Sequence, residues 1–197
     1  MRHRGDWVGG ILICGERVLG YFASSLTRLD ESRFNSRIGD NEGQQIWEAL
    51  CVLVALRAWI KQWAAVRVLL TSKPDNLSAL VMAGKLKITS STLIAREVAL
   101  LLSEAAFMPR HIEHLPGVMN TWAGALSRLA EPGSNHAIPE QLRSAPRARC
   151  EPRSAAFYTT LATESQGGGR RVDGWFGWLL AGTRSYRTVI RTVPFQP

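Results

Sequence analysis

Hydrophobic and polar residues follow regular patterns through the first two thirds of the chain, and these patterns predict its secondary structure. Trp7–Cys14 and Arg17–Leu26 are apolar stretches joined by the turn residues Gly15 and Glu16, which is typical of a β-hairpin. A third and weaker strand is expected at Arg33–Ile38. The chain therefore opens with strands that we expect to pair antiparallel.

The strongest helical pattern follows at Glu42–Ala64, where apolar residues recur at three- and four-residue spacing. Val66–Leu70 is then a continuous apolar run of the kind found in buried strands. The remaining expected elements are a short helix from Pro74 to about Met82, a helix over Ser91–Phe107, a strand at His111–Leu115 and a helix over Asn120–Leu129. This order predicts an α/β domain with a mixed central sheet, in which three leading antiparallel strands precede alternating strands and helices.

The periodic pattern ends after Ala130. Residues 131–197 hold most of the prolines, the glycine run Gly167–Gly169 and scattered arginines, and no apolar period is sustained there. The stretch GWFGWLLAG could still contact the domain. We expect two parts, a folded domain over residues 1–130 and an irregular, largely disordered tail over residues 131–197.

The composition favours a polyanionic partner. Twenty-four lysines and arginines against 16 acidic residues give a net charge of +8, which is shared evenly between the two parts. Three widely spaced cysteines without a C-x-x-C motif fit reduced intracellular thiols better than a disulfide framework or a zinc site. The chain has no apolar run near the ~20 residues of a membrane span. We expect a soluble intracellular protein, cytoplasmic or nuclear, with no membrane partner.

Three polar positions stand where chemistry is possible. Glu48 lies on the strongest helix close to its apolar face, and Asp75 follows a buried strand directly. His114 closes the last strand, six residues before Asn120. Each has an ordinary alternative: Glu48 as an exposed residue near a helix start, Asp75 and Asn120 as helix caps, and His114 as a polar strand end.

Taken together, these positions belong to motifs that resemble the ribonuclease H domain attached to reverse transcriptase in retroelement polyproteins. The motifs are WVGGILI, WEALCVLVALRAW, LLTSKPDNLSAL and EHLPGVMNTWAGALSRL, which span residues 7–129. The tail lies outside the resemblance, and we find no polymerase motif. The resemblance implies a ribonuclease H-like fold for residues 1–130. It also implies a reverse transcriptase domain elsewhere in a parent retrotransposon polyprotein as a partner.

The activity that the resemblance implies is endonucleolytic hydrolysis of the RNA strand of an RNA–DNA hybrid. In that family four carboxylates hold two Mg²⁺ (or Mn²⁺) ions, which activate a water and stabilise the leaving oxygen. They come from the first strand, the long helix, the end of the next strand and the last helix. A histidine ten residues before the last carboxylate assists proton transfer or product release.

The match to this catalytic set is partial. Glu48 corresponds to the helix carboxylate, Asp75 to the strand-end carboxylate and His114 to the histidine, so these are the candidate catalytic residues, with Glu48 and Asp75 as the metal ligands. Gly124 stands where the last carboxylate is expected.

The first-strand carboxylate is also unmatched. Its region holds Arg2 and His3, and Asp6 is three or four positions away, about 10–13 Å along a strand. That distance is too large for a metal–oxygen bond near 2.1 Å. With two of four ligands missing, we expect hydrolysis to be impaired.

Three functions remain open at this point. The chain could be a residually active nuclease, a non-catalytic nucleic-acid-binding module, or a decayed retroelement reading frame with no selected role. In the second case the candidate contacts to nucleic acid are Asn76, Asn120, Arg57, Lys61, Lys85 and Lys87. The alternative for the four basic residues is an ordinary solvated face.

Overall fold

The structure, a computed structural model, describes residues 7–14, 16–40, 43–63, 68–74, 92–104, 107–112, 121–129, 137–159 and 186–194. Its described part is a mixed α/β fold, with a five-stranded sheet in the order β2-β1-β5-β3-β4. The strands are β1 (Trp7–Cys14), β2 (Arg17–Ser25), β3 (Val68–Pro74), β4 (Phe107–Ile112) and β5 (Tyr186–Pro194).

The strand directions make the sheet mixed. β1 and β2 pair antiparallel from Trp7↔Ser25 to Cys14↔Arg17, which confirms the predicted hairpin. β5 runs parallel to β1 and antiparallel to β3, while β3 and β4 are parallel. The C-terminal strand β5 therefore joins the hairpin to the pair β3–β4.

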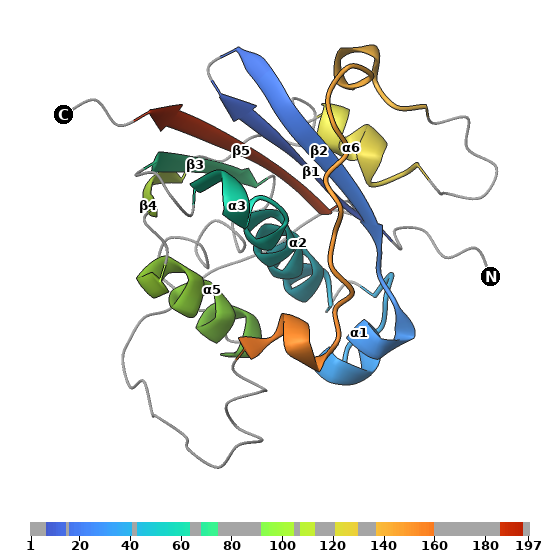
Figure 1. The fold of residues 1–197 in the computed structure, drawn as a ribbon. Helices are drawn as coiled ribbons and strands as arrows, with labels where there is room; N and C mark the ends of the chain where they lie inside the picture. Colours follow the sequence, from blue (N-terminus) through green and yellow to red (C-terminus); the bar gives the residue numbers. More distant parts are fainter. Residues whose placement is uncertain are drawn as a thin grey trace.

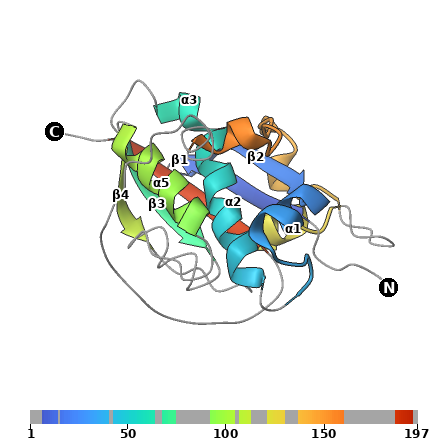
Figure 2. The ribbon, with the colours of Figure 1, turned by 90° about the horizontal axis from the view of Figure 1, so that it is seen from below.

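Helices cover both faces of the sheet (Figures 1 and 2). The helices are α1 (Arg28–Phe34), α2 (Gln44–Ala58), α3 (Ile60–Trp63), α5 (Thr92–Glu104) and α6 (Thr121–Leu126), with 3-10 turns η1 (Glu140–Leu142) and η2 (Ala155–Phe157). α2 lies across one face with α5 beside it, and α6 lies on the other face against the hairpin. The helices predicted from the long periodic segments are confirmed, with shorter bounds.

Successive side chains of β1 point to opposite faces of the sheet, so they belong to two separate apolar clusters. Val8 and Leu12 belong to the larger cluster with α2 and α5, whereas Ile11 belongs to a smaller one with Ala123 and Leu126 of α6. Nearly the whole of α2 is buried, from Gln44 to Leu56 apart from Gln45. The hairpin is thus the layer between the two clusters.

The predicted third strand at Arg33–Ile38 is wrong, because α1 takes up its first half. Thr27 caps this helix: its hydroxyl accepts from the Asp30 backbone N–H at 3.3 Å, and its own N–H donates to the Asp30 carboxylate at 2.8 Å. Asn35 then ends the helix with a φ of 47°. The local capping residues outweigh the weak strand pattern, so two antiparallel strands lead the chain where three were expected.

Two segments of residues 131–197, where the sequence predicts a largely disordered tail, are part of the fold. Residues 137–159 are an ordered segment against the domain, with Leu142, Phe157 and Tyr158 at most 3% exposed, and residues 186–194 form β5. Disorder was expected because no apolar period runs through these residues. Instead, single apolar side chains far apart in the segment reach the core. The short helix predicted from Pro74 and the stretch GWFGWLLAG lie outside the described residues.

Candidate functional site

Glu48 lies in the first half of α2, within the core of the larger cluster. Its exposed fraction is 2%, and Gln44, one turn earlier, donates from Nε2 to Glu48 Oε1 at 3.1 Å. The alternative of an ordinary exposed glutamate is therefore wrong. A buried carboxylate requires polar partners, because removing an unpaired charge from water has a large free-energy cost.

Gly124 lies inside α6, within the helix predicted over Asn120–Leu129, and the structure shows that it is buried. Its carbonyl oxygen accepts from Ser127 Oγ at 3.1 Å and from Arg128 Nε at 2.8 Å. Residue 124 therefore brings no carboxylate to the domain.

Helices α2 and α6 both contact the sheet at Gly9 of β1. On one face Cys51 of α2 donates from Sγ to the Gly9 carbonyl at 3.4 Å. On the other face, a Cβ at position 9 would lie 2.9 Å from Leu126 Cβ and 3.1 Å from the Ser127 N atom. Glu48 lies one turn before Cys51 in α2, and Gly124 lies beside Ala123 in α6. The two residues therefore belong to helices that pack on opposite faces of β1 near Gly9.

The end of β3 lies level with this point of β1. Pro74 pairs with Thr188 of β5, and Thr188 pairs with Gly10. One strand separates the two positions, which places them about 10 Å apart across the sheet. Asp75, the next residue along the chain, lies outside the described residues.

Several other sequence candidates also lie outside the described residues. They are Asn76, Lys85, Lys87, His114, Asn120, Arg2, His3 and Asp6. Of the predicted catalytic set, the structure therefore describes Glu48 and the position of Gly124.

The described residues do not by themselves fit a two-metal centre. Within the described ranges, no group of three or more His, Cys, Asp and Glu side chains could hold a metal ion. Glu48 contributes one carboxylate, with one oxygen already bonded to Gln44, and position 124 contributes none.

Arg57, a predicted phosphate contact, is engaged inside the fold. Its Nη2 lies 2.6 Å from Glu97 Oε2 and 3.0 Å from Thr159 Oγ1, and its guanidinium stacks over the Phe157 ring at 4.9 Å. Its side chain is 17% exposed and that of Glu97 is fully buried. Lys61 of α3, by contrast, is exposed, as a phosphate contact must be.

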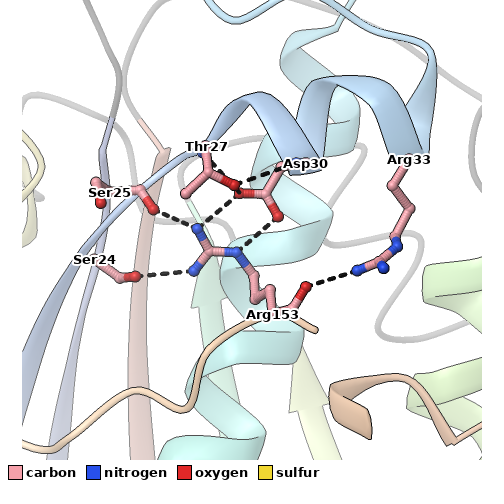
Figure 3. A network of polar contacts seen from close by, with 6 residues as sticks. All are labelled: Ser24, Ser25, Thr27, Asp30, Arg33 and Arg153. Carbon is pink, nitrogen blue, oxygen red and sulfur yellow. Dashed lines mark hydrogen bonds and ion pairs between the residues drawn. The ribbon is translucent and has the colours of Figure 1, made fainter. Parts of the chain in front are cut away.

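A second buried ion pair, between Asp30 and Arg153, was missed by the sequence analysis (Figure 3). Arg153 donates from Nε to Asp30 Oδ1 at 2.9 Å and from Nη2 to Oδ2 at 2.8 Å, the two-pronged geometry in which arginine binds carboxylates best. The pattern Thr-x-x-Asp at residue 27 could have revealed the α1 cap. The partner of Asp30 had no local signal, since it lies 123 residues away.

Two neighbouring groups have raised pKa values. Burial raises the pKa of the Tyr158 hydroxyl to about 12, the Asp30 charge adds to this, and Arg153 and Arg33 oppose it. Burial also raises the pKa of the Cys150 thiol, against the smaller effects of Arg153 and Arg147. Burial therefore favours the neutral form of both groups.

Comparisons with known proteins leave the family of this chain open. The chain matches no protein-family model, no curated protein sequence and no solved structure. Within the described parts, no helix is long and apolar enough to cross a lipid bilayer.

Proposed function

We propose that the chain is a ribonuclease H-like domain of the retroelement, reverse transcriptase-associated type. In this proposal it binds RNA–DNA hybrids, and its hydrolase activity is lost or weak. The observation that carries the proposal is α6, where the helix and its close contact with Gly9 are in place while residue 124 is a glycine. A helix at this place that carries glycine at position 124 supports a ribonuclease H-like scaffold with an incomplete ligand set.

The order of elements supports the same proposal. The hairpin β1–β2 is followed by α2, β3, α5, β4 and α6, and the helices lie on both faces of a mixed sheet. This agrees with the order expected for a ribonuclease H-like domain, except that α1 replaces the third strand and β5 lies between β1 and β3.

The metal ligands of the proposal are Glu48 and Asp75, with Mg²⁺ or Mn²⁺ as the cofactor. Bound metal would supply the activated water and the stabilisation of the leaving oxygen. Of these two ligands, Glu48 is 2% exposed and accepts a hydrogen bond from Gln44. Two carboxylates can hold one ion weakly, which supports weak hydrolysis at most.

Binding to the hybrid rests on the positive charge of +8 and on exposed basic residues such as Lys61. Because such contacts release counterions, the affinity should fall steeply with salt. Arg57 is not included among these contacts, because its guanidinium forms an ion pair with Glu97. A reverse transcriptase domain in the parent polyprotein is the proposed protein partner.

The test of hydrolysis uses a labelled RNA–DNA hybrid with Mg²⁺ or Mn²⁺. We expect the natural chain to leave the hybrid intact, and a variant with Gly124→Asp and either Arg2→Asp or His3→Asp to cut it. Adding Glu48→Gln to that variant should remove the cleavage again. Efficient, Glu48-dependent cleavage by the natural chain would refute the claim of impairment.

The test of binding uses the same hybrid without metal, titrated at several salt concentrations. Lys61→Ala should weaken binding and reduce the slope of log affinity against log salt by about 1. Arg143→Ala removes an equal charge from an exposed position that is not among the candidate nucleic-acid contacts, and it serves as the matched control. If the natural chain does not bind the hybrid at low salt, the proposed function is wrong.

A further inference from the structure

The outer edge of β2 is covered by a segment from the C-terminal third of the chain. β2 is the first strand in the sheet order, so among the described strands none pairs with its side away from β1. Residues 146–148 run along it: the Tyr21 N–H donates to the Pro146 carbonyl at 3.2 Å, and the Ala148 N–H donates to the Tyr21 carbonyl at 2.7 Å. Tyr21 and Arg147 form a parallel bridge there.

The same segment wraps from one face of the sheet to the other. Before the bridge, Leu142 is fully buried in the cluster on the α6 face. After it, Phe157 and Tyr158 are buried in the cluster on the α2 face. Figure 1 shows this path as the orange chain that crosses the hairpin toward α1 and α5. We call residues 137–159 the edge strap.

Arg153 fixes the strap between β2 and α1. Besides its two bonds to Asp30, it donates from Nη1 to Ser24 Oγ at 2.9 Å and from Nη2 to the Ser25 carbonyl (Figure 3). Its own carbonyl accepts from Arg33 Nη1 at 2.7 Å. The exposed fractions of the Arg153 and Asp30 side chains are 5% and 0%, so the charges are compensated within the fold.

The receiving surface is shaped for a closely approaching chain. A Cβ at Gly20 of β2 would lie 3.1 Å from the Pro146 carbonyl oxygen and 3.3 Å from Trp59 Nε1. The site therefore combines the outer edge of β2, a buried carboxylate that binds a planar guanidinium through two bonds, and an apolar cluster that accommodates two aromatic rings. These features select an extended peptide segment with an arginine followed by aromatic residues.

We propose that β2 and α1 form an internal docking site for an extended, arginine-bearing segment, and that the edge strap is its occupant. The strap covers the outer edge of β2 at Tyr21. It is therefore a structural part of the domain and not an appendage to it. This inference is independent of the proposed nuclease ancestry.

The experiment uses the full chain and compares Arg153→Met with Arg149→Met, which removes an exposed arginine from the same strap. The rate of alkylation of Cys150, located by mass spectrometry, reports release of the strap, because this thiol is partly buried against the core. We expect Arg153→Met to raise that rate at least about tenfold and to lower the Tm on the order of 10 °C. Arg149→Met should change neither quantity.

Arg153→Lys distinguishes the guanidinium from its charge. Lysine keeps the charge but lacks the planar fork, so the labelling rate of this variant should resemble that of Arg153→Met more than that of the natural chain. Equal labelling of Cys150 in the Arg153→Met and Arg149→Met chains would overturn the proposal.

Hydrogen exchange of the unmutated chain provides a test that does not depend on a variant folding. The Tyr21 and Ala148 amides each donate across the contact, so both should be protected and should exchange together as denaturant is added. An Ala148 amide that exchanges at the rate of free peptide, while the β1–β2 amides remain protected, would also overturn the proposal.

Discussion

Asp30 serves two partners with one carboxylate. Its Oδ2 accepts from the Thr27 N–H and hydroxyl at the start of α1, and both of its oxygens accept from Arg153. A negative charge at a helix start is favoured by the helix dipole, and the arginine offsets the remaining cost of burial. A single buried residue thus orients a helix and a distant segment at the same time.

Tyr158 should make stability depend on pH in the alkaline range. Its pKa is about 12 in the folded chain against an ordinary value of 10.0, so the folded state favours the neutral phenol. The resulting stabilisation is fully present below pH 10 and is lost as the pH rises from about 10 to 12. We expect a loss on the order of 2 kcal/mol in the free energy of unfolding.

Urea unfolding between pH 8 and 12 would measure this loss, with Tyr158→Phe as the control. The natural chain should lose more stability over this range than the Phe variant, because other titrating groups are common to both. Parallel pH profiles for the two chains would contradict the expectation.

The sequence predicted which residues to examine better than it predicted their surroundings. Glu48 and Gly124 stood out through the resemblance, and the structure places both in buried helical positions. The sequence could not show that Arg57 is paired with Glu97, because the two residues are 40 positions apart and no local pattern links them. Ion pairs formed across the fold leave no periodic signal in the chain.

At the scale of elements, strong periodicity gave reliable predictions and weak periodicity did not. β1 has the predicted bounds, and the helix predicted over Glu42–Ala64 contains α2 and α3. Arg33–Ile38 failed because the capping box at Thr27 and Asp30 starts a helix just before it. The contact of α6 with β1 depends on the small size of Gly9. The sequence shows the glycine, but it does not show that Leu126 lies against it.

Gly9→Ala should destabilise the contact of α6 with β1. The added Cβ would meet the Leu126 Cβ at 2.9 Å and the backbone at Ser127, neither of which can move without shifting α6. We expect a loss of about 1–3 kcal/mol in the free energy of unfolding, measured by urea denaturation. Arg17→Ala, at an exposed position of the same hairpin, is the control. Equal unfolding midpoints for the two variants would show that α6 does not approach β1 as described.

At the scale of the whole molecule, the division at residue 130 does not separate a domain from an appendage. The strap supplies buried residues to both clusters, and β5 pairs with β1 on one side and β3 on the other. Apolar periodicity could not reveal these contributions, since the strap has an irregular backbone and reaches the core through isolated side chains. Contacts between the ends of the chain complete the fold.

A chain ending at residue 130 should therefore not unfold cooperatively. It would lack β5 and would expose the surfaces that Leu142, Phe157 and Tyr158 cover. Thermal unfolding followed by circular dichroism should give a broad, shallow change for this chain and a single transition for the full chain. A truncated chain with the same sharp midpoint as the full one would restore the boundary suggested by composition.

The position of the strap also sets an order of events during synthesis. The edge of β2 leaves the ribosome early, but Arg147, which bonds to the Ala23 carbonyl, follows 124 residues later. At roughly 5–20 residues per second, this leaves the nascent hairpin with an open edge for about 6–25 s. An unpaired strand edge can bind other extended chains, so the newly made protein is most prone to aggregation in this interval. Slower translation would lengthen the interval, and a chaperone that shields the hairpin would be needed most before the strap emerges.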